Sequence, residues 1–426
     1  MELPVIVSAV SLVFFLALSL PIGVALGLSV ALALFAGDLP PELMMQKMFM
    51  ALDSFPLLAV PLFILSGELM QKGRMASTLL SLSRSLIGHI HGGMAHIAVL
   101  TSLFYGALCG SAPATVAAVG GIMIPAMEKD KYPLRYATAV NTTAGCLGVL
   151  IPPSVPLIIY GTQANISISD LFIAGVVPGL FIGTLLIVMC YIVCKLKAYG
   201  NTQPKASIKD ILRNLAGAGY ALVVPVVVLG GIYGGVVTPT EAGALAALYA
   251  LFVEVVITRS INAQGLCEVL WSTVISTATI FYIVAPATAL GQLLLIYNTP
   301  DIVSNLLAGI IGNKYLLLTA IIVILLITGT FLDTISNIVL LTPLFMPALA
   351  QAGVDPVHFG IVMITALAIG FLTPPVGVNL FVGCGISKLS IEELSASVLP
   401  FLVVLVGALM VIAFVPALSL SLVPVR

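Results

Sequence analysis

Two pairs of polar interruptions in an otherwise apolar sequence hold the residues that could do chemistry. Residues 106–115 read Gly-Ala-Leu-Cys-Gly-Ser-Ala-Pro-Ala-Thr, and the break Gly-Val-Leu-Ile-Pro-Pro-Ser follows at 148–154. Residues 329–337 and 370–376 form a second such pair. Because glycine and proline interrupt helices, main-chain oxygens at these places lose their intrahelical partners. Together with nearby hydroxyl groups, these oxygens could bind a cation.

The interruptions recur at one constant spacing along the chain. Four pairs of residues lie 222 positions apart: Pro125 and Pro347, Gly148 and Gly370, Pro152 and Pro374, and Pro178 and Pro400. A constant spacing predicts that the chain is a duplication. Interruptions in corresponding positions of two halves are typical of the binding site of a secondary transporter.

The composition indicates a protein of the lipid bilayer. Of the 426 residues, 60% are hydrophobic and 8% are charged, whereas a soluble domain has about 25% charged residues. The net charge of −1 gives no support for a nucleic-acid partner. We therefore predict an all-α polytopic membrane protein.

The elements that must position the interruptions are membrane spans. Ten apolar runs approach the roughly 20 residues of a crossing: 4–20, 22–37, 53–71, 134–165, 169–197, 215–236, 238–258, 273–297, 358–386 and 397–420. Whether residues 4–37 form one kinked span or two stays open.

Two further apolar segments, 88–127 and 313–350, are broken in the middle by the polar turns. We expect re-entrant helical hairpins there, because irregular backbone at membrane depth must be buried in protein or line a cavity. The Pro-Pro sequences predict broken helices at 134–165 and 358–386.

The two halves are expected to be inverted repeats, 1–197 and 215–426, each with five spans and one hairpin. The linker 198–214 and the residues flanking it are rich in lysine and arginine, which predicts a cytoplasmic location. An odd number of spans places the second half upside down. Hairpin one then opens to the cytoplasm, hairpin two opens to the periplasm, and their tips meet near the midplane in an elevator-type architecture.

Each hairpin tip offers carbonyl oxygens at the end of its first helix and amide groups at the start of its second. In the first half, the carbonyls of 106–110 and the hydroxyl of Ser111 are expected to face 148–153. Oxygen ligands with little fixed charge favour sodium over a divalent metal.

The second half predicts a second sodium site in the same way. Residues 329–333 are expected to face 370–376, with the hydroxyl of Thr373 as an added ligand. Asp333 is a carboxylate at membrane depth, which makes it a candidate ligand as well.

An organic anion is expected between the tips, because amides at helix starts attract carboxylates. No arginine lies in the predicted membrane interior, so hydroxyl groups, amides and the bound cations must hold the anion. The side chains expected near it are Ser111, Thr115, Ser154, Ser336, Asn337 and Asn379.

Two other acidic residues are given structural roles. Glu241 follows Thr238-Pro-Thr, which predicts a capping box at a helix start. Glu68 lies four residues before Lys72, which predicts a solvated ion pair along one helix.

The chain resembles the large membrane subunit, called M or DctM, of tripartite ATP-independent periplasmic (TRAP) transporters. The resemblance covers nearly the whole chain, and its motifs are 52–63, 110–115, 151–154 with 158–161, 238–241 and 373–377. It implies a sodium-driven elevator importer in a bacterial or archaeal inner membrane, with a small four-helix membrane subunit and a periplasmic binding protein as partners. Implied substrates are organic acids such as C4-dicarboxylates and sialic acid.

The resemblance also implies which residues lie at the two sodium sites. They are Gly106, Ser111, Gly148, Ile151 and Pro153 in the first half, and Gly329, Gly370, Thr373 and Val376 in the second. Two other classes of protein stay open. A passive channel could use the same polar breaks. An intramembrane serine protease could use Ser111, although neither Pro-Pro break contains a His or Lys to act as its base. We expect a transporter and not an enzyme.

Overall fold

The computed structural model describes residues 2–200 and 205–424, and every regular element in this part is helical. Residues 201–204 of the predicted linker 198–214 lie outside the described residues. The first half contains α1 (Leu3–Ala17), α2 (Ile22–Gly37), α3 (Pro41–Leu52), η1 (Phe55–Leu58), α4 (Ala59–Lys72), α5 (Met75–Ile87), α6 (Gly93–Cys109), α7 (Ala112–Thr115), η2 (Val116–Gly120), α8 (Gly121–Lys129), α9 (Leu134–Ala144), α10 (Leu147–Leu150), α11 (Val155–Ala164) and α12 (Ile168–Lys197). The second half contains α13 (Ile208–Tyr233), α14 (Pro239–Leu251), η3 (Phe252–Ile257), α15 (Ala263–Ile296), α16 (Thr299–Ile311), α17 (Lys314–Thr328), α18 (Thr334–Gln351), α19 (Pro356–Gly370), α20 (Val378–Ser387), α21 (Ile391–Phe414) and α22 (Ala417–Leu420).

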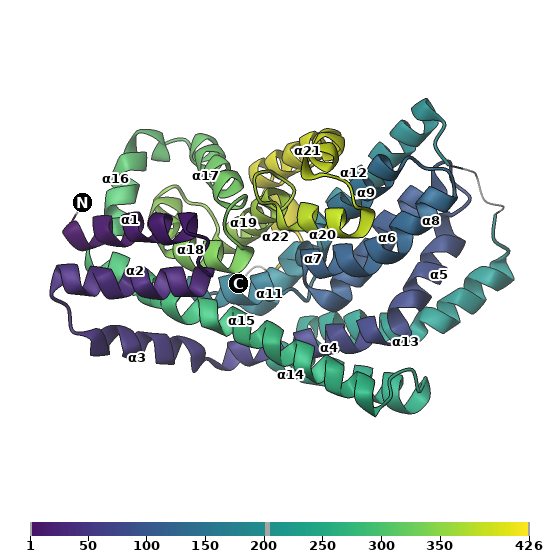
Figure 1. Ribbon diagram of the computed structural model, residues 1–426, viewed down its shortest axis with the longest axis horizontal. Coiled ribbons are helices and arrows are strands. Elements are labelled where there is room, and N and C mark those ends of the chain that lie inside the picture. Colours follow the sequence, from purple (N-terminus) through teal and green to yellow (C-terminus); the bar gives the residue numbers. More distant parts are fainter. Residues whose placement is uncertain (1, 201–204, 425–426) are drawn as a thin grey trace.

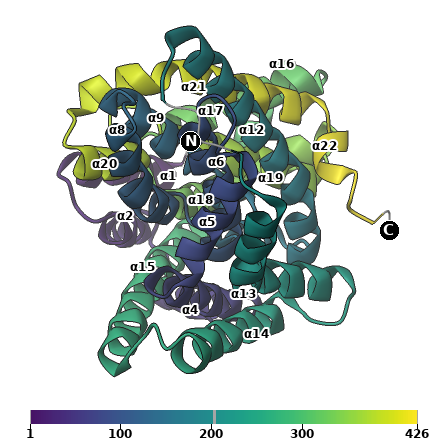
Figure 2. The ribbon, with the colours of Figure 1, turned by 90° about the vertical axis from the view of Figure 1, so that its right-hand side faces the viewer.

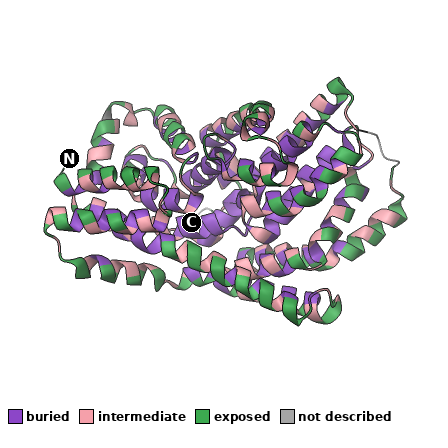
Figure 3. Ribbon diagram, viewed as in Figure 1, coloured by how far each residue is buried: buried purple, intermediate pink, exposed green. Residues whose placement is uncertain are grey.

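The lengths and apolar character of these helices confirm an all-α polytopic membrane protein. Seven helices of the described part are long and apolar enough to cross a membrane, and the pair α9–α10 and α11, bent by 42°, adds an eighth. Large apolar side chains are exposed on the outer helices, among them Phe35 at 86% and Phe49 at 72%, while the buried residues gather in the middle of the molecule (Figure 3). Such a surface suits contact with lipid tails.

Residues 4–37 form two helices and not one kinked span. α1 and α2 are joined by a turn at 18–21, in which Ser19 has a φ of 60°. The two helices pack along each other (Figure 1). Pro21 is therefore a turn residue directly before α2, where a missing amide hydrogen has no cost.

The spacing of 222 residues persists in the bounds of the helices. α3 begins at Pro41 and α15 at Ala263, while α9 begins at Leu134 and α19 at Pro356. α3 and α4 together correspond to α15 and contact it along their length. They run in the opposite direction, since Lys72 at the end of α4 pairs with Glu268 in the first turns of α15.

The broken helices and the hairpins of the two halves pack crosswise. α11 of the first half packs against α18 of the second, and α20 of the second packs against α7, η2 and α8 of the first. Between them lies α19, in which His358 to Gly370 are all buried. Figure 1 shows α11, α18 and α19 in the middle of the molecule, and Figure 2 shows α20 beside α8 at one side of it. The two hairpins and the two broken helices therefore form one packed unit.

α5, which connects α4 to hairpin one, is tied at its start to the second half. The fully buried carboxylate of Glu254 in η3 accepts hydrogen bonds from the amides of Arg74 (3.1 Å) and Met75 (2.9 Å). The hydroxyls of Thr258 and Ser260 also donate to it. A carboxylate at a helix start is favourable because the first amides have no partners inside the helix. The connection to hairpin one is thus anchored on η3.

Candidate functional site

The tip of hairpin one touches the first broken helix main chain to main chain. α6 ends at Cys109, Gly110 takes a φ of 63°, and Ser111 directly precedes α7. A Cβ atom added to Gly106 would lie 2.9 Å from the carbonyl oxygen of Leu147 and 3.0 Å from the Cα of Gly148. Only a glycine allows this approach. The structure thus brings Gly106 and Ser111 up to the break, as the sequence predicts.

The tip of hairpin two makes the same contact in the second half. A Cβ atom added to Gly370 would lie 2.8 Å from both the Cα and the carbonyl carbon of Gly329. Asp333 caps α18, because its carboxylate accepts from the amides of Ile335 (2.9 Å) and Ser336 (3.2 Å) and from the Ser336 hydroxyl. The tip of hairpin two therefore carries a carboxylate that accepts three hydrogen bonds, whereas the tip of hairpin one carries the neutral Ser111.

The Pro-Pro breaks share one backbone feature and differ in burial. The Pro152–Pro153 and Pro374–Pro375 bonds are both cis. Residues 151–154, with Ile151 and Pro153, are buried, whereas 374–376 are exposed and Val376 is 37% exposed. The hydroxyl of Thr373 donates to the carbonyl of Ile369 at 3.3 Å, which leaves its oxygen free to accept.

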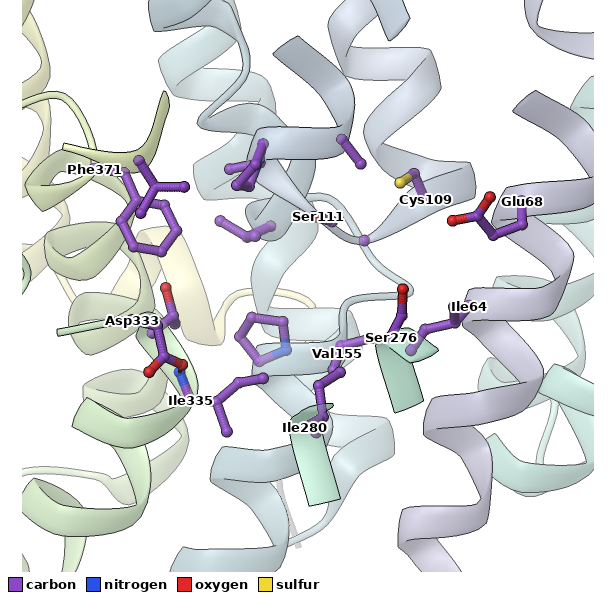
Figure 4. A pocket seen from close by; sticks show the side chains of 18 of the residues that line it. Ile64, Glu68, Cys109, Ser111, Val155, Ser276, Ile280, Asp333, Ile335 and Phe371 are labelled. Atoms are coloured by element: carbon purple, nitrogen blue, oxygen red, sulfur yellow. Dashed lines mark hydrogen bonds between the residues drawn. The ribbon is translucent and has the colours of Figure 1, made fainter. Parts of the chain in front are cut away.

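A cavity of about 290 Å³ lies between the two tips and the helices α4 and α15 (Figure 4). Ser111 and Asp333 both line it, on walls formed by the two hairpins. α4 and α15 form the rest of the wall, and α4 packs against the tip of hairpin one, since a Cβ atom added to Gly67 would lie 3.1 Å from the Cα of Cys109. The residues that line the cavity are Ile64, Glu68, Gln71, Cys109, Gly110, Ser111, Ala112, Pro113, Ala114, Val149, Val155, Pro156, Ser276, Ile280, Asp333, Thr334, Ile335, Phe371 and Val378.

Five of the side chains expected around an anion do not line this cavity. Thr115, Ser154, Ser336, Asn337 and Asn379 are buried, and their polar groups bind the tips and breaks instead. The hydrogen bonds run from Thr115 to the Ser111 carbonyl (2.8 Å), from Ser154 to the Val149 carbonyl (2.7 Å), from Ser336 to the Asp333 carboxylate, from Asn337 to the carbonyls of Leu332 and Asp333 (both 3.1 Å), and from Asn379 to the Cys146 sulfur (3.8 Å). These buried side chains therefore stabilise the tips and breaks and do not face the cavity.

Glu68 is a cavity residue that the sequence analysis assigned to another role. The predicted pair with Lys72 is wrong, because the Lys72 ammonium contacts Glu268 at 2.7 Å. Glu68 instead accepts from the Ser272 hydroxyl at 3.0 Å and faces the cavity from α4 (Figure 4). Glu268 was missed as a partner because α15 starts at Ala263, ten residues before the apolar run that predicted it. The capping box at Glu241 is confirmed.

Comparison with known families shows to which family the chain belongs. Residues 9–418 match the family described as "Tripartite ATP-independent periplasmic transporter, DctM component". The chain belongs to the DctM family. The resemblance seen in the sequence is confirmed over nearly its whole length.

Among the related proteins, the isethionate TRAP transporter permease protein DctMQ of Oleidesulfovibrio alaskensis is 40% identical over 95% of this chain. The chain spans 64% of the length of that protein. The C4-dicarboxylate TRAP transporter large permease protein DctM of Pseudomonas aeruginosa is 37% identical over 93% of both chains. The sialic acid TRAP transporter large permease protein SiaM of Vibrio cholerae is 38% identical over 88% of both chains.

A solved structure shares the fold. The YdaH transporter of Alcanivorax borkumensis superposes with a TM-score of 0.66 over 98% of this chain and 100% of its own, at 15% sequence identity. With its family known, this DctM protein is a multi-pass membrane component of a transporter and not an enzyme. The serine protease alternative is therefore excluded.

Proposed function

We propose that this chain imports an organic anion across the inner membrane of a bacterium or archaeon by coupling its movement to sodium. The observation that carries the proposal is the repeated contact of a hairpin tip with a broken helix on two sides of one cavity. Irregular backbone of this kind supplies oxygen ligands and free amides in a protein that is otherwise apolar.

The first proposed sodium site lies where tip one meets break one. Its ligands are main-chain oxygens near Gly106, Gly148, Ile151 and Pro153, with the hydroxyl of Ser111. The carbonyl of Gly106 accepts from the Gly110 amide and still has a second lone pair. These neutral oxygens fit a monovalent hard cation.

The second proposed site repeats the first at tip two. Its ligands are main-chain oxygens near Gly329, Gly370 and Val376, with the hydroxyl of Thr373. Asp333 adds a negative charge at this tip, and we include it in the site as a group that attracts the cation in addition to capping α18.

The organic anion occupies the cavity between the tips. Ser111 offers it a hydroxyl that has no hydrogen-bond partner among the described residues, and the start of α7 adds main-chain amides. Relatives are named for isethionate, C4-dicarboxylates and sialic acid, all of them organic acids. Thr115, Ser154, Ser336, Asn337 and Asn379 support the site as positioning residues.

Transport itself is proposed to follow an elevator mechanism. The halves 1–197 and 215–426 are taken as inverted repeats, with the linker 198–214 in the cytoplasm, so that the packed unit of hairpins and broken helices faces each side of the membrane in turn. α4 and α15, together with α1, α2, α13 and α14, form the frame. Cysteine pairs that join Ala114 to positions at several depths of α4 and α15 test the motion. Cross-links that form at one depth only would contradict it.

Sodium coupling is tested in liposomes that contain the complete transporter. We expect uphill uptake of the organic acid with an inward sodium gradient, and none when potassium replaces sodium. Uptake that needs ATP, or that proceeds equally in potassium, refutes the coupling. Flux that never exceeds equilibrium identifies a passive channel instead.

We also propose that the chain works with a small four-helix membrane subunit and a periplasmic substrate-binding protein. The longest polar segment of the sequence, from Lys195 to Arg213, is too short to fold as a capture domain. The relative named DctMQ carries further sequence beside the matched part. Liposomes with this chain alone should transport poorly, and addition of both partners should restore uptake. Full-rate transport by the isolated chain contradicts this.

A further inference from the structure

Two carboxylates line the central cavity, and no basic side chain of the described residues does. Asp333 lies on the wall formed by hairpin two, and Glu68 lies on the wall formed by α4, on opposite sides of the space (Figure 4). Lys72 is the nearest basic residue along α4, and Glu268 already binds its ammonium. The cavity is therefore negatively charged before any ion or substrate enters it.

The two carboxylates differ in how many hydrogen bonds they accept. Asp333 accepts three hydrogen bonds at the start of α18 and is held as a cap. Glu68 accepts one, from Ser272, and its second oxygen has no donor among the described residues. An incompletely bonded carboxylate at membrane depth is costly unless a ligand completes it. Glu68 thus has an open acceptor that faces the space where the substrate is proposed to bind.

The rest of the wall limits what can fill this space. Ile64, Ile280, Val155 and Phe371 make much of it apolar, and its volume is about 290 Å³. Ser111 provides a hydroxyl donor on hairpin one, and Glu68 provides an acceptor on α4. A molecule that fits therefore has an anionic group and, separately, a hydrogen-bond donor.

Building on the proposed function, we propose that Glu68 determines substrate specificity by accepting a hydrogen bond from a hydroxyl or ammonium group of a small monoanionic acid. A dicarboxylate places its second negative charge against Glu68 with no basic side chain to offset it. Like charges a few ångströms apart inside a protein repel each other, which weakens the binding of a dianion relative to a monoanion.

Three acids with the same four-carbon chain separate the possibilities. Butanoate ends in a methyl group, 4-hydroxybutanoate in a hydroxyl and succinate in a second carboxylate. Their affinities are measured by calorimetry on the chain purified with its small membrane subunit, in sodium chloride and again in potassium chloride. In sodium we expect 4-hydroxybutanoate to bind about tenfold more tightly than butanoate and than succinate.

Variants then assign the preference to Glu68. Glu68→Gln should reduce the preference for 4-hydroxybutanoate over succinate about tenfold, and Glu68→Asp should keep its direction. Glu42→Gln is the matched control, because it removes an exposed carboxylate of α3 that lies outside the cavity and should leave the ranking unchanged. Retained melting temperature and elution volume show that each variant is folded.

Three results would overturn the inference: succinate binding as tightly as 4-hydroxybutanoate, a ranking unchanged in Glu68→Gln, or no binding of any of the three acids. None of them decides the proposed function, which stands or falls with sodium-driven uphill uptake. If uptake does not depend on sodium but the three acids keep their order of affinity, the coupling is refuted and the role of Glu68 stands.

Discussion

The two Pro-Pro breaks share the sequence Gly-x-Leu-x-Pro-Pro and a cis Pro–Pro bond, yet one is buried and the other is exposed. Break one lies under α12, where a Cβ added to Gly175 would come within 2.7 Å of the Leu150 carbonyl oxygen and one added to Gly179 within 2.4 Å of the Ile151 side chain. At the position that corresponds to Gly179, α21 has Phe401. The Pro-Pro break is thus common to both halves, while the helices at the corresponding positions, α12 and α21, differ.

The tips differ in a related way. At corresponding positions, tip one has the neutral Ser111 and tip two has the carboxylate of Asp333 as a helix cap. The backbone contact between tip and broken helix is common to both halves, and the side chains around it are not. Substitutions should therefore have equal effects at the shared contact and unequal effects around it.

The largest effect is expected at the glycines of the shared contact. Gly370→Ala and Gly148→Ala each place a methyl group less than 3 Å from a main-chain atom, which should destabilise the protein by about 2 kcal/mol and reduce uptake to background. Gly121→Ala, with no atom within 4 Å of the added carbon, is the control. Thermal unfolding in detergent and uptake in liposomes measure both quantities. If only one of these two alanine substitutions is tolerated, the contact is not equivalent in the two halves.

Cysteine labelling should reveal the difference in burial. Val376→Cys and Ser154→Cys occupy corresponding positions, at 37% and 1% exposure. In a background without the partly or fully exposed Cys109, Cys267 and Cys384, a maleimide should react at least about tenfold faster at 376 than at 154. Similar rates would mean that break one opens as readily as break two.

Two substitutions of Asp333 can distinguish its role as a helix cap from its role as a charge at the proposed sodium site. Asp333→Ala should lower the free energy of unfolding by about 1 kcal/mol, because the amides of Ile335 and Ser336 lose their acceptor. Asp333→Asn keeps the acceptor and should retain stability, while raising the sodium concentration for half-maximal uptake about threefold. An unchanged sodium requirement would remove Asp333 from the ion site.

The smallest effect is expected from Thr373. Thr373→Val removes one hydroxyl oxygen in the second half, where the corresponding residue of the first half, Ile151, has none. The sodium concentration for half-maximal uptake should rise about twofold to threefold with the maximal rate unchanged. Ser111→Ala removes the hydroxyl of the first site, and a response to neither substitution would exclude both hydroxyl groups as sodium ligands.

The interrupted segments could be predicted from the sequence because their signal is local. The hairpins expected at 88–127 and 313–350 correspond to α6–α8 and to α17–α18, and both broken helices bend where two prolines adjoin. The short helices α3, α5 and α16 were not predicted, because 12 or 13 residues with polar faces do not resemble a span. What fills the gaps between apolar runs is set by tertiary packing.

The cavity could be predicted only on its hairpin side. Ser111 and Asp333 are expected there from their place at the tips, but the part of the wall that α4 forms depends on how this helix turns toward them, which no local pattern specifies. The spacing of Glu68 and Lys72 is compatible with an ion pair, and a partner from a distant helix overrode it. Asn337 and Asn379 are near the tips in sequence, yet they point into the protein.

The crosswise packing of α11 on α18 and of α20 on α7–α8 has a consequence for biosynthesis. When the ribosome has made the first half, α11 has been inserted into the membrane but still lacks the helix that covers it. Insertion and folding are therefore separated in time. The first half is in the bilayer before it is fully packed, and its packing is completed only after α18 has been synthesised. A gene divided within the linker should for this reason yield two fragments that are degraded when expressed singly and are stable when expressed together.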